Sequence, residues 1–483
     1  MRIEDNIIEL ISPEKNPVSF KIILDSNHDE TYTYNVFIIN GPAPETNIIN
    51  TITYEIQGKG HAAYLDLFQK ISADFGTRTP QNRKNTKQEP SFKVNYRTVL
   101  TDNLHPEMFY GYGDPAILKA DNKGKEVYYL VSTSNDAANS FPLIKSTDLK
   151  NWEFCKYIFP EGNKPAWAAE GESIADYWAP EIHQVNNEFR MYFVAREKAS
   201  RELCIGLARA SHPENTFIPE PEPILDGNVI DPHLYIEDNE NVYLFWKEDN
   251  NDIWPQKLSD LLFKHPELIT ELFTTDEDRR TASLITCFWP WAKDLGAMER
   301  FCVLQVFIEA VIEQYLSFHL KLQNLAKEKQ HLKKEIDEIL MYMKTPMFCQ
   351  KLNADGTKLL GEKTQVMEND LEWEAHLVEG MWVTKHSNKY YLFYAGNDFS
   401  TDQYGIGVAI ADQVTGPYIK SESQLLKSTK EWLAPGHPSV LQTKEGEYLM
   451  FLHAFFPGSA GYKKFRALLE VPIEFEGNKV IIK

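Results

Sequence analysis

Acidic or histidine residues open five similar segments of this 483-residue chain: Asp114, Glu181, Asp231, Glu379 and His437. Carboxyl groups brought to one place suit general acid–base chemistry, in which an ionised group removes a proton and a protonated group donates one. A third carboxylate can raise the pKa of the donor, because a neighbouring negative charge disfavours ionisation. Asp114, Asp231 and Glu379 supply the three carboxyl groups that this chemistry needs. They predict a catalytic centre with a base, an acid and a residue that tunes the acid.

The segments that follow these residues share one pattern: an apolar stretch, a polar turn and a second stretch rich in Tyr and Phe. Examples are DPAILKADNKGKEVYYLVS from Asp114 and HPSVLQTKEGEYLMFLHA from His437. Two alternating apolar stretches around a tight turn predict a β-hairpin. Repeats of this kind are typical of radial folds in which each unit supplies a four-stranded blade. We therefore expect a five-bladed β-propeller whose innermost strands carry all five residues at the same rim, toward a shared axis.

One interval between the repeats is much longer than the others. The five residues are 67, 50, 148 and 58 positions apart, and from about 258 to 344 the apolar residues change to helical spacing. The stretch 298–340 predicts either one long helix or two helices broken near 327–330. We expect a helical insertion, residues 258–344, between blades three and four. It forms either a packed bundle or a surface for a second copy of the chain or another protein.

The rest of the chain divides between the repeats and an N-terminal region. Residues 96–257 and 345–483 carry the repeats and are assigned to the all-β propeller domain. Residues 1–95 lie outside the pattern: apolar alternation at 18–25 and 31–40 predicts strands, and 62–75 predicts a short helix. This region is expected to be a small accessory domain, α+β or all β, that ends in a polar linker at 78–90.

Composition argues against several classes of function. The net charge of −20 disfavours nucleic acid or an anionic membrane as the main partner. Five cysteines without CxxC spacing predict reduced thiols that bind no metal. Because no secretory leader is visible and no apolar run reaches ~18–20 residues, we expect a cytoplasmic protein, with signal-independent export as the alternative. Phosphate-binding glycine loops, serine nucleophile motifs and zinc-ligand spacings are absent from the sequence.

Short motifs at the blade starts resemble those of glycoside hydrolase family 43. They are GYGDP (111–115), YWAPE (177–181), IDP (230–232), EGMW (379–382) and GHPSV (436–440). The resemblance covers about residues 105–257 and 345–483, and leaves the N-terminal region and the helical insertion unmatched. It implies Asp114 as general base, Glu379 as general acid and Asp231 as the residue that modulates the pKa of the acid. No cofactor is required for such chemistry.

The resemblance implies further roles around these carboxyl groups. Trp178 would border or stack on a sugar, and Arg466 would contact substrate. His437 would lie on the axis beside a calcium or sodium ion, reached directly or through water. Two departures bear on these roles: EGMW replaces the commoner EGPW, and Pro438 lacks a backbone N–H that could serve the ion. Glu181 stands where Asp is frequent and is interpreted as structural.

The leading functional interpretation is a glycosidase that cleaves arabinose- or xylose-containing glycans with inversion, because inversion needs a base and an acid on opposite sides of the sugar. A retaining, fructosidase-type propeller would want an Asn-Asp-Pro-Asn-like motif, which GYGDPAIL does not supply. The alternative from another class is a catalytically idle propeller that serves as a sugar-binding or docking scaffold. The expected partners are a glycoside or oligosaccharide substrate and, through the insertion, a second copy or another protein.

Overall fold

The computed structural model describes residues 9–41, 48–58, 61–78, 94–122, 124–171 and 175–483. The chain divides into two compact units. One unit comprises residues 1–87 and 250–344, and the other comprises residues 88–249 and 345–483. The predicted linker at 78–90 lies, apart from Arg78, outside the described residues.

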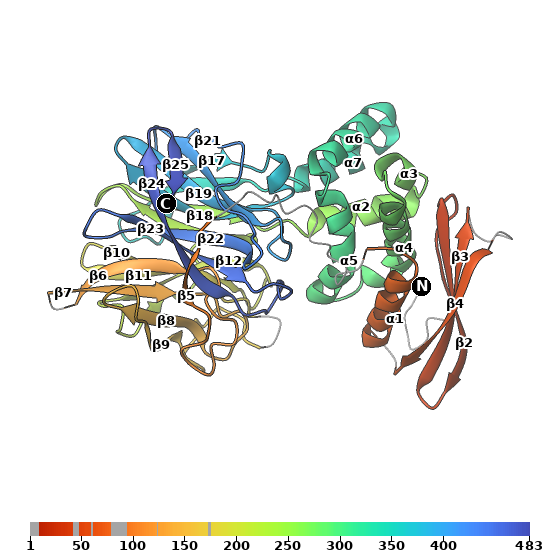
Figure 1. Cartoon of the computed structure of the whole chain (residues 1–483), viewed down its shortest axis with the longest axis horizontal. Coiled ribbons are helices and arrows are strands. Elements are labelled where there is room, and N and C mark those ends of the chain that lie inside the picture. Colours follow the sequence, from red (N-terminus) through yellow and green to blue (C-terminus); the bar gives the residue numbers. More distant parts are fainter. Residues whose placement is uncertain (1–8, 42–47, 59–60, 79–93, 123, 172–174) are drawn as a thin grey trace. The chain divides into compact units, whose positions relative to one another are not determined.

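The unit formed by 88–249 and 345–483 is a ring of five antiparallel sheets (Figure 1). Blade one is β6 (Ala116–Asn122), β7 (Lys125–Val131), β8 (Ser140–Ser146) and β9 (Glu153–Phe159); blade two is β10 (Trp178–Val185), β11 (Glu188–Arg196), β12 (Leu203–Ala210) and β13 (Ile218–Pro219). Blade three is β14 (Val229–Ile236), β15 (Val242–Glu248), β16 (Met347–Leu352) and β17 (Leu359–Met367); blade four is β18 (Val378–His386), β19 (Lys389–Gly396), β20 (Gly405–Ala411) and β21 (Ile419–Lys420). Blade five is β22 (Leu433–Gln442), β23 (Tyr448–Phe455), β24 (Ala467–Glu476) and β25 (Lys479–Ile482). The first strand of each blade contacts the first strand of the next, and β22 contacts β6, so the predicted five-bladed propeller is confirmed.

The ring is closed by a strand from its N-terminal side. β5 (Arg97–Leu100) pairs with β24 of blade five, in the register Leu468↔Leu100 and Glu470↔Arg97. A parallel bridge between Gly111 and Arg466 continues this junction toward blade one. Backbone hydrogen bonds therefore tie the start of the propeller to its last blade, and part of the edge of β24 is covered.

The helical insertion splits blade three, which corrects its predicted place between blades three and four. β15 and β16 are neighbours in one sheet, with Tyr243 opposite Lys351 and Lys247 opposite Met347. The chain leaves the blade after its second strand and returns as its third. An interval measured between blade starts is lengthened equally by an insertion inside a blade and by one after it, so the spacing alone could not distinguish the two.

Aromatic residues of the repeats pack the blades together. The β11 sequence EFRMYFVAR is buried at seven of its nine positions, because neighbouring blades cover both faces of its sheet. Phe193 lies against Phe141, Phe159 and Trp167, with ring centroids 5.6, 5.2 and 6.0 Å apart. These residues come from blades one and two and the loop between them. The Tyr/Phe-rich runs are therefore the packing between wedge-shaped blades.

Residues 1–87 and 250–344 form one unit in which a sheet packs on helices (Figure 1). The sheet is β1 (Glu9–Ile11), β2 (Val18–His28), β3 (Thr31–Asn40) and β4 (Ile48–Gln57), and it is accompanied by α1 (His61–Asp74). On α1, the ring of Phe68 packs against Phe288 with ring centroids 5.3 Å apart. The ring of Tyr64 packs against Trp291 with ring centroids 5.4 Å apart. The N-terminal region and the insertion, which the sequence suggested as two separate parts, thus share one core.

Six helices and a short 3-10 turn make up the inserted part. They are α2 (Ile253–Lys264), α3 (Leu268–Leu272), α4 (Asp276–Ala292), α5 (Ala297–Ile312), α6 (Tyr315–Glu328), η1 (Gln330–Leu332) and α7 (Lys333–Tyr342). The predicted break near 327–330 is confirmed between α6 and α7, and a second break separates α5 from α6, where the chain turns by 89°. Among the described residues no single helix has the length and apolar composition to cross a membrane; α5 and α6 would qualify only as this bent pair.

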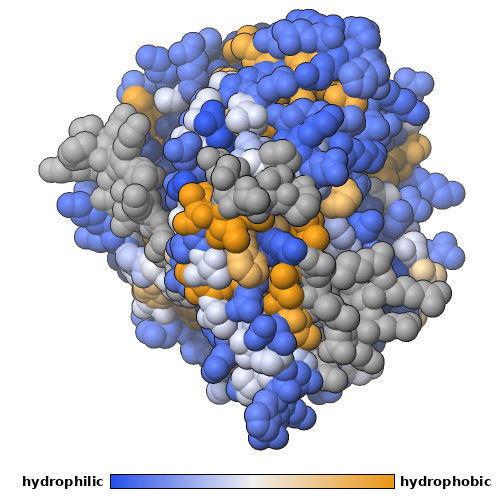
Figure 2. All heavy atoms as spheres, turned by 90° about the vertical axis from the view of Figure 1, so that its right-hand side faces the viewer, coloured by the Kyte–Doolittle hydropathy of each residue, from blue (hydrophilic) through white to orange (hydrophobic). Residues whose placement is uncertain are grey.

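Figure 2 shows apolar residues among polar ones on the face that corresponds to the right-hand side of Figure 1. The exposed large apolar residues of β1 and β4 are Ile11, Ile48 and Ile49, and Ile48 and Ile49 begin β4. Phe20 and Ile22, at alternate positions of β2, are almost inaccessible. One face of the sheet is therefore buried, while the first part of β4 is exposed.

We expect that the propeller folds without the other unit. Joining Asp249 directly to Thr345 leaves four residues between the paired residues Lys247 and Met347. Four residues are a common length for a hairpin loop. A protein of residues 88–249 and 345–483 should show a single cooperative melt and a β-type circular dichroism spectrum. Light scattering on the full chain and on this protein also tests whether the insertion mediates self-association.

The informative control retains residues 1–87 but lacks 250–344. Its α1 and sheet would expose the face that Phe288 and Trp291 cover, so we expect it to bind a hydrophobic dye and aggregate. A propeller-only protein that fails to melt cooperatively, while the full chain does, would show that the two units depend on one another.

Candidate active site

The innermost strands of the propeller share a backbone kink. One residue at the start of each has a positive φ: Asp114 (52°), Ala179 (40°), Asp231 (56°), Gly380 (59°) and His437 (49°). In blades two to five a β-bulge interrupts the strand pairing at this point. A positive φ is strained for residues other than glycine, so its recurrence reflects a requirement of the ring. The bulge turns the local side chains out of the regular alternation.

The five predicted residues do not all occupy equivalent positions. Asp114, Asp231 and His437 lie at the kink itself, whereas Glu379 precedes the kink by one residue and Glu181 follows it by two. The five residues are therefore offset by one or two positions along their strands rather than equivalent. Glu379 nevertheless stays beside the others, because the backbone N–H of Gly380 donates to Asp231 Oδ2 at 2.8 Å.

Asp114 is held by cationic and hydroxyl groups. Arg466 binds both of its oxygens, with Nη1 2.8 Å from Oδ1 and Nη2 3.3 Å from Oδ2, and the Thr133 hydroxyl also donates to Oδ2. His437 and His453 place Nδ1 at 3.4 and 3.5 Å from Oδ1. Burial by itself would raise the pKa of Asp114, but Arg466, the two histidines and the hydroxyl hold it well below its ordinary range. Asp114 is ionised at neutral pH.

Glu379 has the opposite environment. Its Oε1 accepts a hydrogen bond from the Tyr404 hydroxyl at 2.7 Å, and its Oε2 lies 3.7 Å from Lys247 Nζ. Burial, reinforced by the negative charge of Asp231, raises the pKa of Glu379 to about 7, although Lys247 and the Tyr404 hydroxyl act against that rise. The pKa of Asp231 is itself raised, first by burial and then by Asp114. Glu379 is thus the carboxyl that retains a proton near neutrality.

These environments give one carboxylate that can accept a proton and one carboxyl that can donate one. Asp114 comes from blade one, Asp231 from blade three and Glu379 from blade four. Pairs of titratable groups whose pKa values are moved apart by their surroundings are typical of general acid–base catalysis. The three carboxyl groups that the sequence analysis selected are therefore brought together in one electrostatic network.

The other predicted residues lie around this centre. Trp178, partly exposed, donates from Nε1 to Asn135 Oδ1 at 3.0 Å. Arg466, predicted to contact substrate, directs its guanidinium at Asp114. Glu181 is buried and paired with two histidines: His183 Nε2 at 2.7 Å and His233 Nδ1 at 3.0 Å. The structural interpretation of Glu181 agrees with these contacts, and the roles of Trp178 and Arg466 toward a substrate stay predictions.

Glu181, His183 and His233 also form the one group in the described part of the chain whose possible metal-ligand atoms all lie within 4.8 Å of one another. His233 Nε2 accepts the backbone N–H of Val383 at 2.9 Å, so the ring hydrogen must be on Nδ1, which donates it to Glu181. A metal on Nδ1 would displace this hydrogen to Nε2, against the Val383 N–H. The cluster therefore does not fit a resident metal, and His437 is not part of it.

Several residues of the site were not predicted. Tyr404, Thr133 and His453 carry no sequence pattern that marks them: Tyr404 and Thr133 reach Glu379 and Asp114 from within the same blade, and His453 reaches Asp114 from blade five. Lys247 does leave a signal: it follows the apolar run of the strand VYLFWKE and is buried with that run, although the acidic Glu248 comes directly after it. A polar residue at a core position of a strand indicates a functional or strained site.

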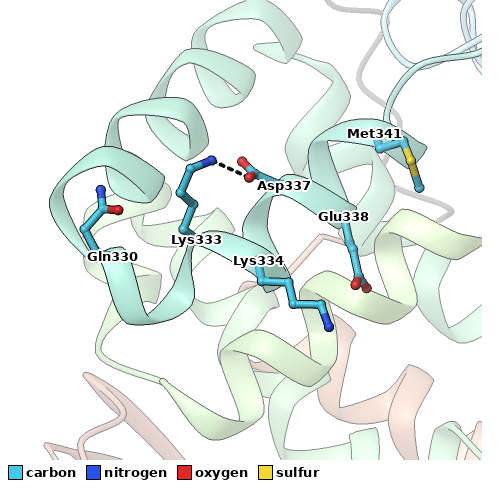
Figure 3. A pocket seen from close by; sticks show the side chains of 6 residues that line it. All are labelled: Gln330, Lys333, Lys334, Asp337, Glu338 and Met341. Atoms are coloured by element: carbon cyan, nitrogen blue, oxygen red, sulfur yellow. Dashed lines mark hydrogen bonds and ion pairs between the residues drawn. The ribbon is translucent and has the colours of Figure 1, made fainter.

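A separate hollow of about 460 Å³ lies on the helices of the other unit (Figure 3). It is lined by Gln330, Lys333, Lys334, Asp337, Glu338 and Met341. Lys333 and Asp337 are ion-paired, and the lining contains neither an aromatic ring nor a buried acid. This open hollow offers nothing comparable to the carboxyl network of the propeller.

Comparison with known proteins agrees with this geometry. The model of glycosyl hydrolases family 43 matches residues 107–286 and 333–480. A xylosidase/arabinosidase 43A of Humicola insolens is 35% identical over 69 residues, which are 14% of this chain and only 21% of that protein. A thermostable family-43 glycoside hydrolase has a similar fold, with a TM-score of 0.53, 22% identity, and 77% of this chain and 93% of that chain covered. An endo-1,4-beta-xylanase of Bacteroides thetaiotaomicron also has a similar fold, with a TM-score of 0.50 and 18% identity. That match covers 81% of this chain and 97% of the xylanase chain.

The kink beside Glu379 yields a test of the packing of the site. A Cβ on Gly380 would lie 2.9 Å from His437 Nδ1, in addition to the strain of φ +59°. Gly477, in the turn between β24 and β25, has the same φ but nothing within 4 Å of such a Cβ. We expect Gly477→Ala to cost ~1 kcal/mol of unfolding free energy. Gly380→Ala should cost ~1–3 kcal/mol more, because the added methyl has no room.

Urea unfolding of both variants, followed by tryptophan fluorescence, measures the difference. Equal losses would mean that His437 moves aside without penalty, and that the contact between blades four and five is loose.

Proposed function

This chain belongs to glycosyl hydrolases family 43, and we propose that it hydrolyses arabinose- or xylose-containing glycosides with inversion at the anomeric carbon. The observation that carries the proposal is the contrast between Asp114, kept ionised by Arg466, and Glu379, kept protonated by burial. An inverting glycosidase needs these two states at one site. A module that only binds sugar has no need of them.

In the proposed reaction Glu379 donates its proton to the glycosidic oxygen as the bond from that oxygen to the anomeric carbon breaks. Asp114 accepts a proton from the water whose oxygen bonds to the same carbon from the opposite face. Asp231 acts on Glu379 rather than on the sugar: its negative charge favours the protonated form of the acid. It also holds the Gly380 N–H, which fixes the backbone beside Glu379.

The sugar class in this proposal is supported by names of relatives and by the family. The curated protein with the matching 69-residue stretch is a xylosidase/arabinosidase, and one protein of similar fold is a xylanase. Trp178 is proposed to border the sugar, because it is partly exposed and lies one residue before the blade-two kink at Ala179. Arg466 is proposed to act mainly through Asp114, and to reach substrate with whatever part of the guanidinium Asp114 leaves open.

The proposal is tested by following hydrolysis with proton NMR. The substrates are 4-nitrophenyl α-L-arabinofuranoside, 4-nitrophenyl β-D-xylopyranoside and the corresponding unactivated disaccharides. We expect at least one sugar to be cleaved and its first-formed anomer to have the inverted configuration, because a water attacks directly. A retained first product would require a covalent intermediate, and no cleavage of any glycoside would favour the scaffold alternative.

Two isosteric variants assign the roles. Asp114→Asn should lose activity on every substrate, since the water lacks its base. Glu379→Gln should lose roughly 10²–10⁴-fold on the disaccharides but far less on nitrophenyl glycosides, whose leaving groups depart without protonation. Similar losses of Glu379→Gln on both classes would contradict its role as the acid.

The ion beside His437 stays a prediction, and only in a hydrated form. His437 offers one ring nitrogen toward Asp114, whose oxygens are already bound by Arg466, so the residues present do not make a direct calcium site. Treatment with EDTA should leave kcat unchanged and lower the melting temperature at most. A loss of kcat that calcium restores would show that the ion takes part in the reaction.

A further inference from the structure

Lys247 is a buried cation without a hydrogen bond. It lies on β15 of blade three, its side chain is 0% exposed, and Nζ makes no hydrogen bond within the described part of the chain. Its ion pairs are with Asp249 Oδ1 at 3.4 Å and Glu379 Oε2 at 3.7 Å. A buried ammonium group is costly, and an apolar side chain of similar volume would fill the same position at less cost. Packing therefore does not explain why a lysine stands here.

The two oxygens of Glu379 have different partners. Oε1 accepts the hydrogen of the Tyr404 hydroxyl, whereas Oε2 faces Lys247. With the Tyr404 hydroxyl as the donor to Oε1, the protonated acid carries its hydrogen on Oε2. The oxygen that gives up the proton is the one beside the ammonium group.

We propose that Lys247 is a positioning residue that stabilises the carboxylate left on Glu379 when its proton passes to the leaving group. This inference rests on the proposed function. As the glycosidic bond breaks, the proton moves from Oε2 to the departing oxygen, and the negative charge that remains on Oε2 lies 3.7 Å from Nζ. The charge of Lys247 does not change in this step. A charge that stabilises the product side of a proton transfer also lowers its barrier.

Lys247 counterbalances the groups that keep Glu379 protonated. Burial and Asp231 raise the pKa of Glu379, and Lys247 is the strongest influence against them. Without it Glu379 would hold its proton to higher pH but would be a weaker acid for a poor leaving group. The charged or titratable groups around the pair are Asp231 on β14, Asp249 after β15, His376 before β18, Tyr404 before β20 and His437 on β22.

The test compares Lys247→Met with Lys363→Met. Methionine has a similar length but no charge, and Lys363 is a half-exposed lysine of the same blade that pairs with Glu248 at 2.7 Å. The pH profile of kcat/KM, and kcat and KM for a nitrophenyl glycoside and for an unactivated disaccharide, are measured for each. Thermal melting checks that each variant is folded.

In the wild type we expect kcat/KM to fall above about pH 7, as Glu379 loses its proton. Lys247→Met should move this limb to higher pH by roughly one unit or more. Its kcat on the disaccharide should fall about tenfold or more, with kcat on the nitrophenyl glycoside nearly unchanged. Lys363→Met should behave as the wild type.

A second variant gives a shift of opposite sign and does not depend on Lys247→Met being folded. Asp249→Asn leaves Lys247 in place but removes the carboxylate that shares it. Of the two ion-pair partners of the ammonium group only Glu379 then remains, so the fall of kcat/KM at high pH should move to lower pH. A purely structural role of Lys247 would produce no such pair of opposite shifts.

Two results would overturn the inference. One is that neither variant moves the pH at which kcat/KM falls on the basic side. The other is that Lys247→Met raises KM alone, which would make Lys247 a substrate-binding residue. Glu379→Gln separates these from failure of the proposed function. If Glu379→Gln loses the basic limb and the disaccharide activity while Lys247→Met matches the wild type, only the inference about Lys247 fails. If Glu379→Gln keeps both, the acid has been misassigned.

Discussion

The two-point ion pair between Arg466 and Asp114 joins the closure of the ring to its chemistry. The backbone of Arg466 pairs with the segment before blade one: its N–H donates to Tyr110 O, and its carbonyl accepts from Tyr112. A Cβ on Gly113 would overlap the guanidinium at 1.8 Å, so only glycine allows this approach. The residue that fixes the last blade against the first is thus the one that keeps Asp114 ionised. Loosening the closure would release the Asp114 carboxylate at the same time.

The raised pKa of Glu379 comes from a different arrangement of neighbours. Asp114 is surrounded by donors and cations, whereas Glu379 is buried with one hydroxyl, one distant ammonium and a second acid beside it. The residues concerned come from blades one, three and four, with Arg466 from blade five. No blade alone holds both a carboxyl group and the partners that set its protonation state. The contrast between the two acids is a property of the assembled ring.

The sequence predicted the features that repeat. Period-two runs rich in Tyr and Phe were sufficient for five hairpins, and the Asp-Pro pairs marked the kinks at Asp114 and Asp231. The place of the insertion could not be predicted, because the third and fourth strands of blade three, MFCQKL and LLGEKTQVM, have no marker and the latter is mostly exposed. Lys247 was missed because it reaches Glu379 from the neighbouring blade, and Tyr404 because the fold of blade four, rather than any sequence pattern, brings it to Glu379. An apolar helix face likewise shows that something covers it, but does not identify the N-terminal sheet.

The split in blade three has a consequence for the order of folding. Lys247 and Met347 are paired strand residues separated by 100 positions, and closing a flexible loop of that length costs ~4 kcal/mol of chain entropy. The helices change this, because α2 packs on α7 and Lys257 pairs with Glu338 at 2.8 Å near the two ends of the insertion. A folded helical unit delivers β15 and β16 side by side, as a short turn would. The third blade can then form as a local hairpin, and the propeller closes last, when β24 meets β5.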